Sequence, residues 1–270
     1  MRILGVDLAW GERRPDGVAL IEVGRDGQGT LAAADCCRGD DSLITWVRET
    51  VGHGPSLVAL DGPIVCPNLS GGRPVDRETH RFFGRAHAGC HPANLSRCPR
   101  PARICHQLEG LGFSADYRLD EPRQRREADR PLRRQIEVYP HPAAVVLFGL
   151  PRILKYKRGP AAARRRELAR LQCLLAGTLT RLVPPLGMGP QAQALFAVDP
   201  VGLVGAAHKA HEDALDAVLC AVVGWLHWVH GGQQSQVLGD LGTGFLVVPL
   251  VACVGSEHGG PHPGGAAIPG

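Results

Sequence analysis

The stretch "HEDALDAVLCAVVGWL" (His211–Leu226) places the strongest constraint on the fold. Glu212, Asp213 and Asp216 stand near its start, and no charged residue occurs in the rest of it. On a helix of about 3.6 residues per turn, the apolar side chains cover almost the whole circumference, which predicts a helix buried inside the protein. Carboxylates carried into such an interior must be ion-paired, hydrogen-bonded or bound to a metal.

Two explanations of these acids are open. In the structural one, they occupy the first turn of the helix, where negative charge stabilises the helix dipole by about 0.3–1 kcal/mol. In the functional one, they are ligands of a metal ion. For this helix taken alone the two explanations are balanced, so the other acids of the chain decide between them.

Acids also stand in or at the ends of three expected strands. Asp7 interrupts the apolar run at 2–10, Asp61 ends "LVALD", and Glu137 lies within "QIEVYP". Turn formation before a Gly-Pro pair accounts for Asp61 alone, whereas the structural explanation is weaker for Asp7. If acids from strand ends and the helix converge, their repulsion requires a divalent cation between them. Oxygen-only ligands select Mg²⁺ or Mn²⁺.

The rest of the chain alternates short apolar runs with helical patterns. Strands are expected at 2–10, 17–23, 29–36, 56–64, 135–143 and 242–254, and helices at 40–51, 164–182 and 211–226. Residues 66–134 show little periodicity and are expected to form an insertion after the fourth strand, with a helix at 74–87. This order predicts an α/β fold in which helices cover both faces of a mixed sheet. We expect one domain at 1–254 and a disordered Gly- and Pro-rich tail at 255–270.

Composition narrows the class of protein. A hydrophobic content of 44% and a charged content of 21% are typical of soluble globular chains. The longest apolar runs fall well short of the roughly 20 residues of a membrane span. The nine cysteines include no C-x-x-C spacing, which indicates reduced thiols and a cytoplasmic protein. Seven arginines at 118–134 suit either a nucleic-acid backbone or a solvated helix face.

Several short motifs occur in an order that resembles a known family. They are "GVDLAW", "ALDGPI", "GGRPVDRETHRFFGR", "IEVYPHPA", "LKYKRG" and "HEDALDAVLCAV". Together they resemble the family catalogued as domain of unknown function 429, which is described as predicted nucleases with a ribonuclease-H-like fold. "HEDALDA" is also similar to the last-helix motif of RuvC-type Holliday-junction resolvases, which share that fold. The resemblance covers residues 2 to about 249 and implies a ribonuclease-H-like sheet of five or slightly more strands.

The resemblance implies a role for each acid. Asp7 matches the first-strand aspartate that binds both metal ions, and Asp61 matches the acid at the end of the fourth strand. Asp213 and Asp216 match the acids of the closing helix and complete the implied metal site. Glu137 belongs to the family's own E-x-Y/H-P motif and is expected among the catalytic residues.

The resemblance also implies two-metal hydrolysis of nucleic acid, either DNA or RNA. One Mg²⁺ or Mn²⁺ would activate a water molecule, and the other would stabilise the leaving 3′ oxygen. Arg73 and Arg77 of the insertion, together with Lys155 and Lys157, are expected to bind the substrate.

Three other functions stay open. A non-catalytic nucleic-acid-binding protein of the same fold would keep the acids as structural residues. An actin-like ATP-dependent phosphotransferase has a related core, but it needs two Gly-rich phosphate loops in duplicated lobes, which this chain lacks. A zinc site would use Cys90, His91, Cys98, Cys105 and His106, although their spacing matches no usual finger pattern.

Overall fold

The main sheet is mixed, and its two shortest strands form its edges. The computed structural model describes residues 1–11, 14–119 and 131–250. Within these ranges the sheet has seven strands in the order β5-β6-β4-β1-β2-β3-β7. They are β1 (Arg2–Asp7), β2 (Asp16–Val23), β3 (Gly29–Cys37), β4 (Ser56–Asp61), β5 (Ser114–Ala115), β6 (Arg133–Glu137) and β7 (Leu186–Met188). A separate hairpin is formed by β8 (Ser235–Asp240) and β9 (Gly244–Pro249).

Strand direction identifies the fold. β1, β2 and β3 form an antiparallel meander. On the other side of β1 lies β4, which is parallel to it, and β6 is parallel to β4. A meander followed by parallel strands added beside its first strand confirms the expected ribonuclease-H-like fold.

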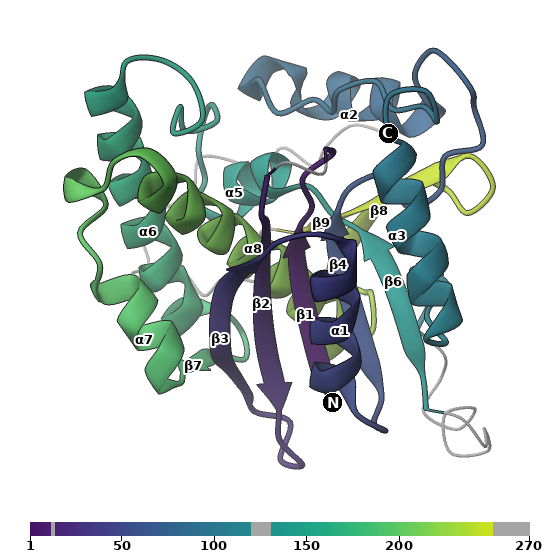
Figure 1. The fold of residues 1–270 in the computed structure, drawn as a ribbon, viewed down its shortest axis with the longest axis horizontal. Coiled ribbons are helices and arrows are strands. Elements are labelled where there is room, and N and C mark those ends of the chain that lie inside the picture. The colour runs from purple at the N-terminus through teal and green to yellow at the C-terminus, as the bar shows by residue number, and fades with distance from the viewer. Residues whose placement is uncertain (12–13, 120–130, 251–270) are drawn as a thin grey trace, which may run out of the picture.

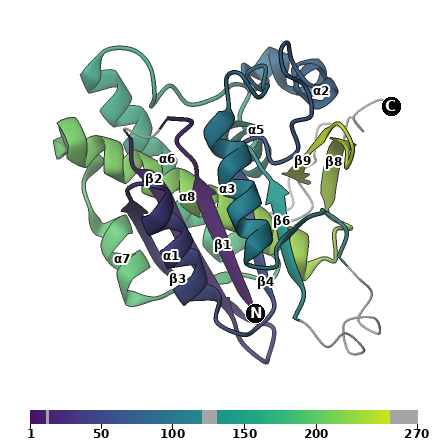
Figure 2. The ribbon, with the colours of Figure 1, turned by 45° about the vertical axis from the view of Figure 1, so that its right-hand side comes forward.

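Helices cover both faces of this sheet, as the sequence predicts. They are α1 (Asp40–Val51), α2 (Pro74–Phe83), α3 (Pro99–Gly110), α5 (Pro140–Leu147), α6 (Ala161–Arg181), α7 (Pro190–Ala197) and α8 (Gly205–Val229), with short 3₁₀ turns η1 (Gly84–Ala86) and η2 (Pro200–Gly202). Two views show α1 and α3 together over one face and α8 across the opposite face (Figures 1 and 2). α5 and α6 contact α8 on that side. None of the helices in the described ranges combines the length and apolar character needed to cross a membrane.

Several element boundaries differ from those expected. α8 begins at Gly205, so its acids lie inside the helix rather than in its first turn, and the helix-dipole explanation does not apply to them. The strand expected at 135–143 ends at Glu137, because Pro140 opens α5. The range 66–134 contains α2, η1, α3 and β5, and its last two residues belong to β6.

Some predictions concern residues that the structure does not describe. Most of the arginine-rich run at 118–134, the end of the strand expected at 242–254 and the tail at 255–270 lie outside the described residues. The sequence did not predict α3, nor several short elements that include α5, α7 and β8.

The backbone of α8 lies directly on the central strands. A Cβ atom added at Gly5 of β1 would stand 2.0 Å from the carbonyl oxygen of Ala217, and one at Gly17 of β2 would stand 2.0 Å from that of Asp213. No side chain fits at either position, so helix and sheet approach more closely than usual. This approach sets the height of Asp213 above the sheet.

Adding one methyl group at Gly17 therefore tests this contact. Gly17→Ala is expected to lower the free energy of unfolding by about 1–3 kcal/mol, because the new atom meets helix backbone that cannot rotate away. Gly54→Ala is the matched control, since no atom lies within 4 Å of its added Cβ. Urea unfolding measures both; equal stability of Gly17→Ala and wild type would contradict the close packing.

Candidate functional site

Two aspartates end neighbouring parallel strands and lie side by side. Asp7 of β1 and Asp61 of β4 are register partners, and parallel strands lie about 4.8 Å apart. Burial raises the pKa of Asp7 and holds that of Asp61 well above its usual range; the negative charge of Asp7 raises the pKa of Asp61 further. The pair therefore forms a buried concentration of negative charge at the carboxyl ends of β1 and β4.

α8 brings two more carboxylates to the same place. Asp213 and Asp216 are three residues apart on one side of the helix, and their exposed fractions are 2% and 0%. Burial, followed by the charge of Asp7, raises the pKa of Asp213 to about 7. The charge of Asp216 in turn raises the pKa of Asp7 and Asp61. The acids that the sequence predicts to converge are thus close enough to influence one another's ionisation.

Lys157, from the segment between α5 and α6, lies among these acids. Its Nζ atom is 2.6 Å from Oδ2 of Asp216, and the hydroxyl of Tyr156 donates to Oδ1 of the same carboxylate at 2.7 Å. Burial lowers the pKa of Lys157, but the charges of Asp216 and Asp7 outweigh it and hold the pKa well above its usual value. Lys157 is therefore a charged partner inside the cluster rather than an exposed contact for substrate.

Lys209 is a second internal cation, and the sequence analysis missed it. It lies one turn before the acids of α8, where its ammonium group donates to Oε1 of Glu212 at 2.8 Å and to Asp213. The i,i+4 spacing from Lys209 to Asp213 is a recognisable sequence signal. It was not used because the helix was expected to begin at His211, two residues after this lysine.

The donor set fits a divalent cation, although the carboxylates are not gathered around one point. Oδ2 of Asp213 is buried, and no N–H or hydroxyl group in the described part of the chain donates to it. Asp7 and Asp61 have no ion pair with any described residue. However, the described residues include no group of three or more His, Cys, Asp or Glu side chains arranged to hold a metal. A divalent cation would bind beside carboxylates that already form ion pairs with Lys157 and Lys209.

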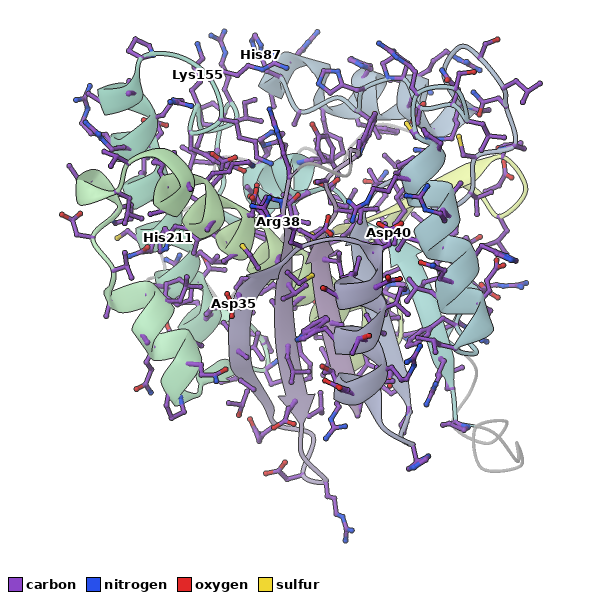
Figure 3. The ribbon with its side chains drawn as sticks, in the orientation of Figure 1. Asp35, Arg38, Asp40, His87, Lys155 and His211 are labelled. Atoms are coloured by element: carbon purple, nitrogen blue, oxygen red, sulfur yellow. The ribbon has the colours of Figure 1, made fainter. Side chains whose placement is uncertain are left out.

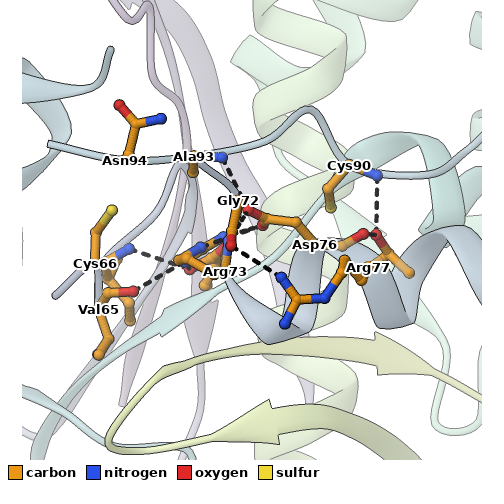
Figure 4. Close-up of polar contacts among 12 residues, drawn as sticks. Val65, Cys66, Gly72, Arg73, Asp76, Arg77, Cys90, Ala93 and Asn94 are labelled. Atoms are coloured by element: carbon orange, nitrogen blue, oxygen red, sulfur yellow. Dashed lines mark hydrogen bonds and ion pairs between the residues drawn. The ribbon is translucent and has the colours of Figure 1, made fainter. Parts of the chain in front are cut away.

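Glu137 and Arg73 form a buried ion pair with each other. The catalytic role expected for Glu137 and the substrate-binding role expected for Arg73 stay predictions. The exposed fraction of Arg73 is 2%, and its guanidinium donates to both oxygens of Glu137 at 2.6 and 2.7 Å and to Oδ1 of Asp76 at 2.9 Å. The backbone N–H groups of Ile64 and Ala93 complete the network, at Glu137 and Asp76 respectively (Figure 4). The network fixes α2 against the end of β6, and both Arg73 and Glu137 line the pocket beside Asp61.

Two other predicted substrate contacts remain accessible. Arg77 is exposed, and its guanidinium donates to the carbonyl oxygen of Gly72 (Figure 4). Lys155 is exposed as well. Both stay predictions as substrate contacts.

A pocket opens beside Asp61, and the predicted site residues Arg73 and Glu137 help to line it. Its lining also includes Cys90 and His91 of the proposed zinc site. Trp10 and Tyr139, which line it too, were not predicted. Trp10 is 38% exposed. Exposed apolar side chains near the end of a strand have no signature in a single sequence.

His211 does not join the acidic cluster, whereas Cys90 and His91 of the proposed zinc site line the pocket beside Asp61. His211 is buried, and its Nε2 pairs with Oε1 of Gln172 in α6 at 2.5 Å (Figure 3). Of the proposed zinc ligands, Cys98 and Cys105 are buried in the protein, while His106 is an exposed partner of Glu109.

The raised pKa of Asp213 predicts a pH dependence that its amide variant lacks. At about pH 8 the carboxyl group is ionised in the folded and the unfolded state, so the folded state bears the cost of a buried charge. As the pH falls through about 7, the folded protein takes up a proton, whereas the unfolded chain does so only near 3.8. The free energy of unfolding therefore rises as the pH falls.

In metal-free protein, we expect the stability of wild type relative to Asp213→Asn to increase between about pH 8 and pH 6. Urea unfolding of both proteins in a chelator measures this, and contributions of titrating groups outside the acidic cluster cancel in the difference. A difference that stays constant, or that shrinks toward pH 6, would show that Asp213 titrates in its ordinary range.

Comparison with known proteins identifies the family. A solved structure, the yeast mitochondrial Holliday junction resolvase Ydc2, resembles the chain with 10% identity and a TM-score of 0.38, over 86% of this chain and 80% of that chain; so distant a likeness supports no argument about function. No curated protein matches. The family described as "Protein of unknown function (DUF429)" matches residues 5–241. Because this match spans most of the chain, and confirms the resemblance in its motifs, the protein belongs to the DUF429 family.

Proposed function

We propose that this protein is a divalent-cation-dependent nuclease that hydrolyses phosphodiester bonds of nucleic acid. The observation that carries the proposal is that Asp213 and Asp216 of α8 lie near Asp7 and Asp61 at the carboxyl ends of β1 and β4. Three of these carboxylates are buried and that of Asp61 is half-buried. Such an arrangement is costly, and proteins commonly keep it for a function that needs it.

The residues of the site have distinct tasks in this proposal. Asp7 and Asp61, which lack ion pairs with the described residues, would hold Mg²⁺ or Mn²⁺, with Asp213 as a further ligand. The bound cation would supply an activated water and stabilise negative charge on the phosphate. Tyr156 holds Asp216 in place through its hydroxyl. Arg77 and Lys155, both exposed, would bind the nucleic-acid backbone.

A second candidate function is a non-catalytic nucleic-acid-binding protein. The ion pairs of Lys157 with Asp216 and of Lys209 with Asp213 favour it, because they neutralise part of the cluster without a metal. Titration of Mn²⁺ against thermal stability separates the two candidates. Binding of Mn²⁺ at 100 times its Kd raises the free energy of unfolding by about 2.7 kcal/mol, whereas a protein with a purely structural cluster shows no shift.

Two wider expectations also stay proposals. We propose a cytoplasmic location, in keeping with the free thiols of the cysteines in the described ranges. We also propose that residues 1–254 form one domain with the range 66–134 inserted between β4 and β6.

Asp7→Asn provides the direct test of the nuclease. Replacing the carboxylate by an amide removes a ligand charge at nearly constant shape, and we expect Mn²⁺-dependent cleavage to fall by about 100-fold or more. Cleavage is measured on labelled single-stranded, duplex and branched DNA and on RNA, with and without a chelator.

Asp41→Asn is the matched control, because Asp41 is an exposed aspartate of α1 outside the cluster. It should cleave as wild type does. Full activity of Asp7→Asn, or cleavage by wild type that persists in the chelator, would refute the proposed chemistry.

A further inference from the structure

We propose that the segment from Arg152 to Arg170 binds the sugar–phosphate backbone of nucleic acid beside the acidic cluster. This basic segment comprises most of the connection between α5 and α6 and the start of α6. The inference rests on the proposed function for the identity of its partner, and it names the surface that holds the substrate.

The basic segment has a charge opposite to that of the rest of the protein. It contains eight Lys or Arg residues and one acid, Glu167, which gives it a net charge of +7. Subtracting these from the 30 Lys or Arg and 26 Asp or Glu of the chain leaves 22 and 25, a net charge of −3. Positive charge concentrated in one short segment is typical of a surface that binds a polyanion. The cations are Arg152, Lys155, Lys157, Arg158, Arg164, Arg165, Arg166 and Arg170.

Most of these cations have no acidic partner within the described protein. Lys157 pairs with Asp216, and none of the other seven forms an ion pair with a described residue. The Nε atoms of Arg164 and Arg165 are buried, and no group in the described ranges accepts a hydrogen bond from them. Arg100, by contrast, is held by two carboxylates. The guanidinium groups of the basic segment are therefore available to an external anion.

Helix stability does not account for the arginines near the start of α6. The first turn of this helix contains no acidic residue, and Arg164, Arg165 and Arg166 follow its three alanines. The N-terminus of a helix carries partial positive charge, so cations stabilise the opposite end. Glu167 has the spacing to pair with Arg164 or Arg170, but it forms an ion pair with neither. An anion bound at this end would relieve the repulsion.

The basic segment is fixed to α8 next to the acidic cluster. On one side, Nζ of Lys157 lies 2.6 Å from Oδ2 of Asp216. On the other, Oε1 of Gln172, just beyond the segment, pairs with Nε2 of His211 at 2.5 Å. His211 and Asp216 are five residues apart on α8, which is about 7.5 Å along its axis. Because both attachments lie on one stretch of α8, and α6 contacts that helix (Figure 1), the cations between them are held beside the acids.

A nucleic-acid backbone is the anion that suits this surface. Phosphates repeat along a strand as the cations repeat along the basic segment, and a guanidinium binds a phosphate through two N–H groups. The aromatic residue of the segment, Tyr156, is 1% exposed, so the segment offers no exposed ring on which a base could stack. Its contacts would be to phosphates rather than to bases, and its affinity should depend little on base sequence.

Removing two exposed cations from the basic segment tests the inference. Fluorescence anisotropy of labelled duplex DNA, single-stranded DNA and RNA, in a chelator and at several salt concentrations, measures affinity without metal-dependent cleavage. A phosphate contact contributes about 0.9 to the slope of log affinity against log salt on duplex DNA. Arg158→Gln combined with Arg166→Gln should therefore flatten the slope by about 1.8 and weaken binding by about 10-fold or more at about 0.1 M salt.

Arg25→Gln combined with Arg48→Gln is the matched control. It removes the same charge from the turn between β2 and β3 and from α1, which covers the face of the sheet opposite α8. This variant should bind as wild type does. Arg164→Gln combined with Arg165→Gln repeats the measurement at the half-buried arginines, and circular dichroism checks that each variant is folded.

The outcomes separate this surface from the nuclease chemistry. Wild-type affinity and slope in both double variants of the basic segment would overturn the surface, as would wild-type protein that binds no nucleic acid. Mn²⁺-dependent cleavage by wild type beside the first of these results would leave the nuclease proposal standing. Binding that the variants weaken, in a protein that cleaves nothing, would support the surface and refute the nuclease.

Discussion

The contact between the backbone of α8 and the glycines of β1 and β2 determines the rest of the structure. Because Gly5 and Gly17 carry no side chain, the helix lies close enough to the sheet for its acids to reach the strand ends. The apolar circumference of α8 then buries the helix against β1, β2 and β3. Asp213 and Asp216 consequently join Asp7 in a setting where water cannot solvate them.

Carboxylates placed together at that position repel one another, and lysines neutralise only part of their negative charge. Lys209, from α8 itself, pairs with Asp213, and Lys157, from a distant segment, pairs with Asp216. The raised pKa values of Asp7 and Asp61 show that the repulsion persists where no lysine is paired. A buried carboxylate pair whose charge is not neutralised is a physical basis for cation affinity. In this account Asp213 and Asp216 form ion pairs with lysines, and Asp7 and Asp61 bind the cation.

The sequence predicted the parts of this site that follow from local pattern. Asp7 and Asp61 end apolar strands, so their placement at one edge of the sheet followed once the strands were neighbours, and the periodicity of α8 predicted its burial. The pairing of Arg73 with Glu137 could not be predicted, because the residues are 64 positions apart and each has a plausible role alone. The position of Lys157 was missed for the same reason. Lys209 was missed only because the start of α8 was placed too late.

The central claim is that carboxylates from β1 and β4 bind a divalent cation. A crystal grown with Mn²⁺ tests it most directly, with anomalous diffraction locating the metal. The account predicts an anomalous peak at coordinating distance from the side chains of Asp7 and Asp61. Absence of any peak at these aspartates, in crystals saturated with Mn²⁺, would contradict it.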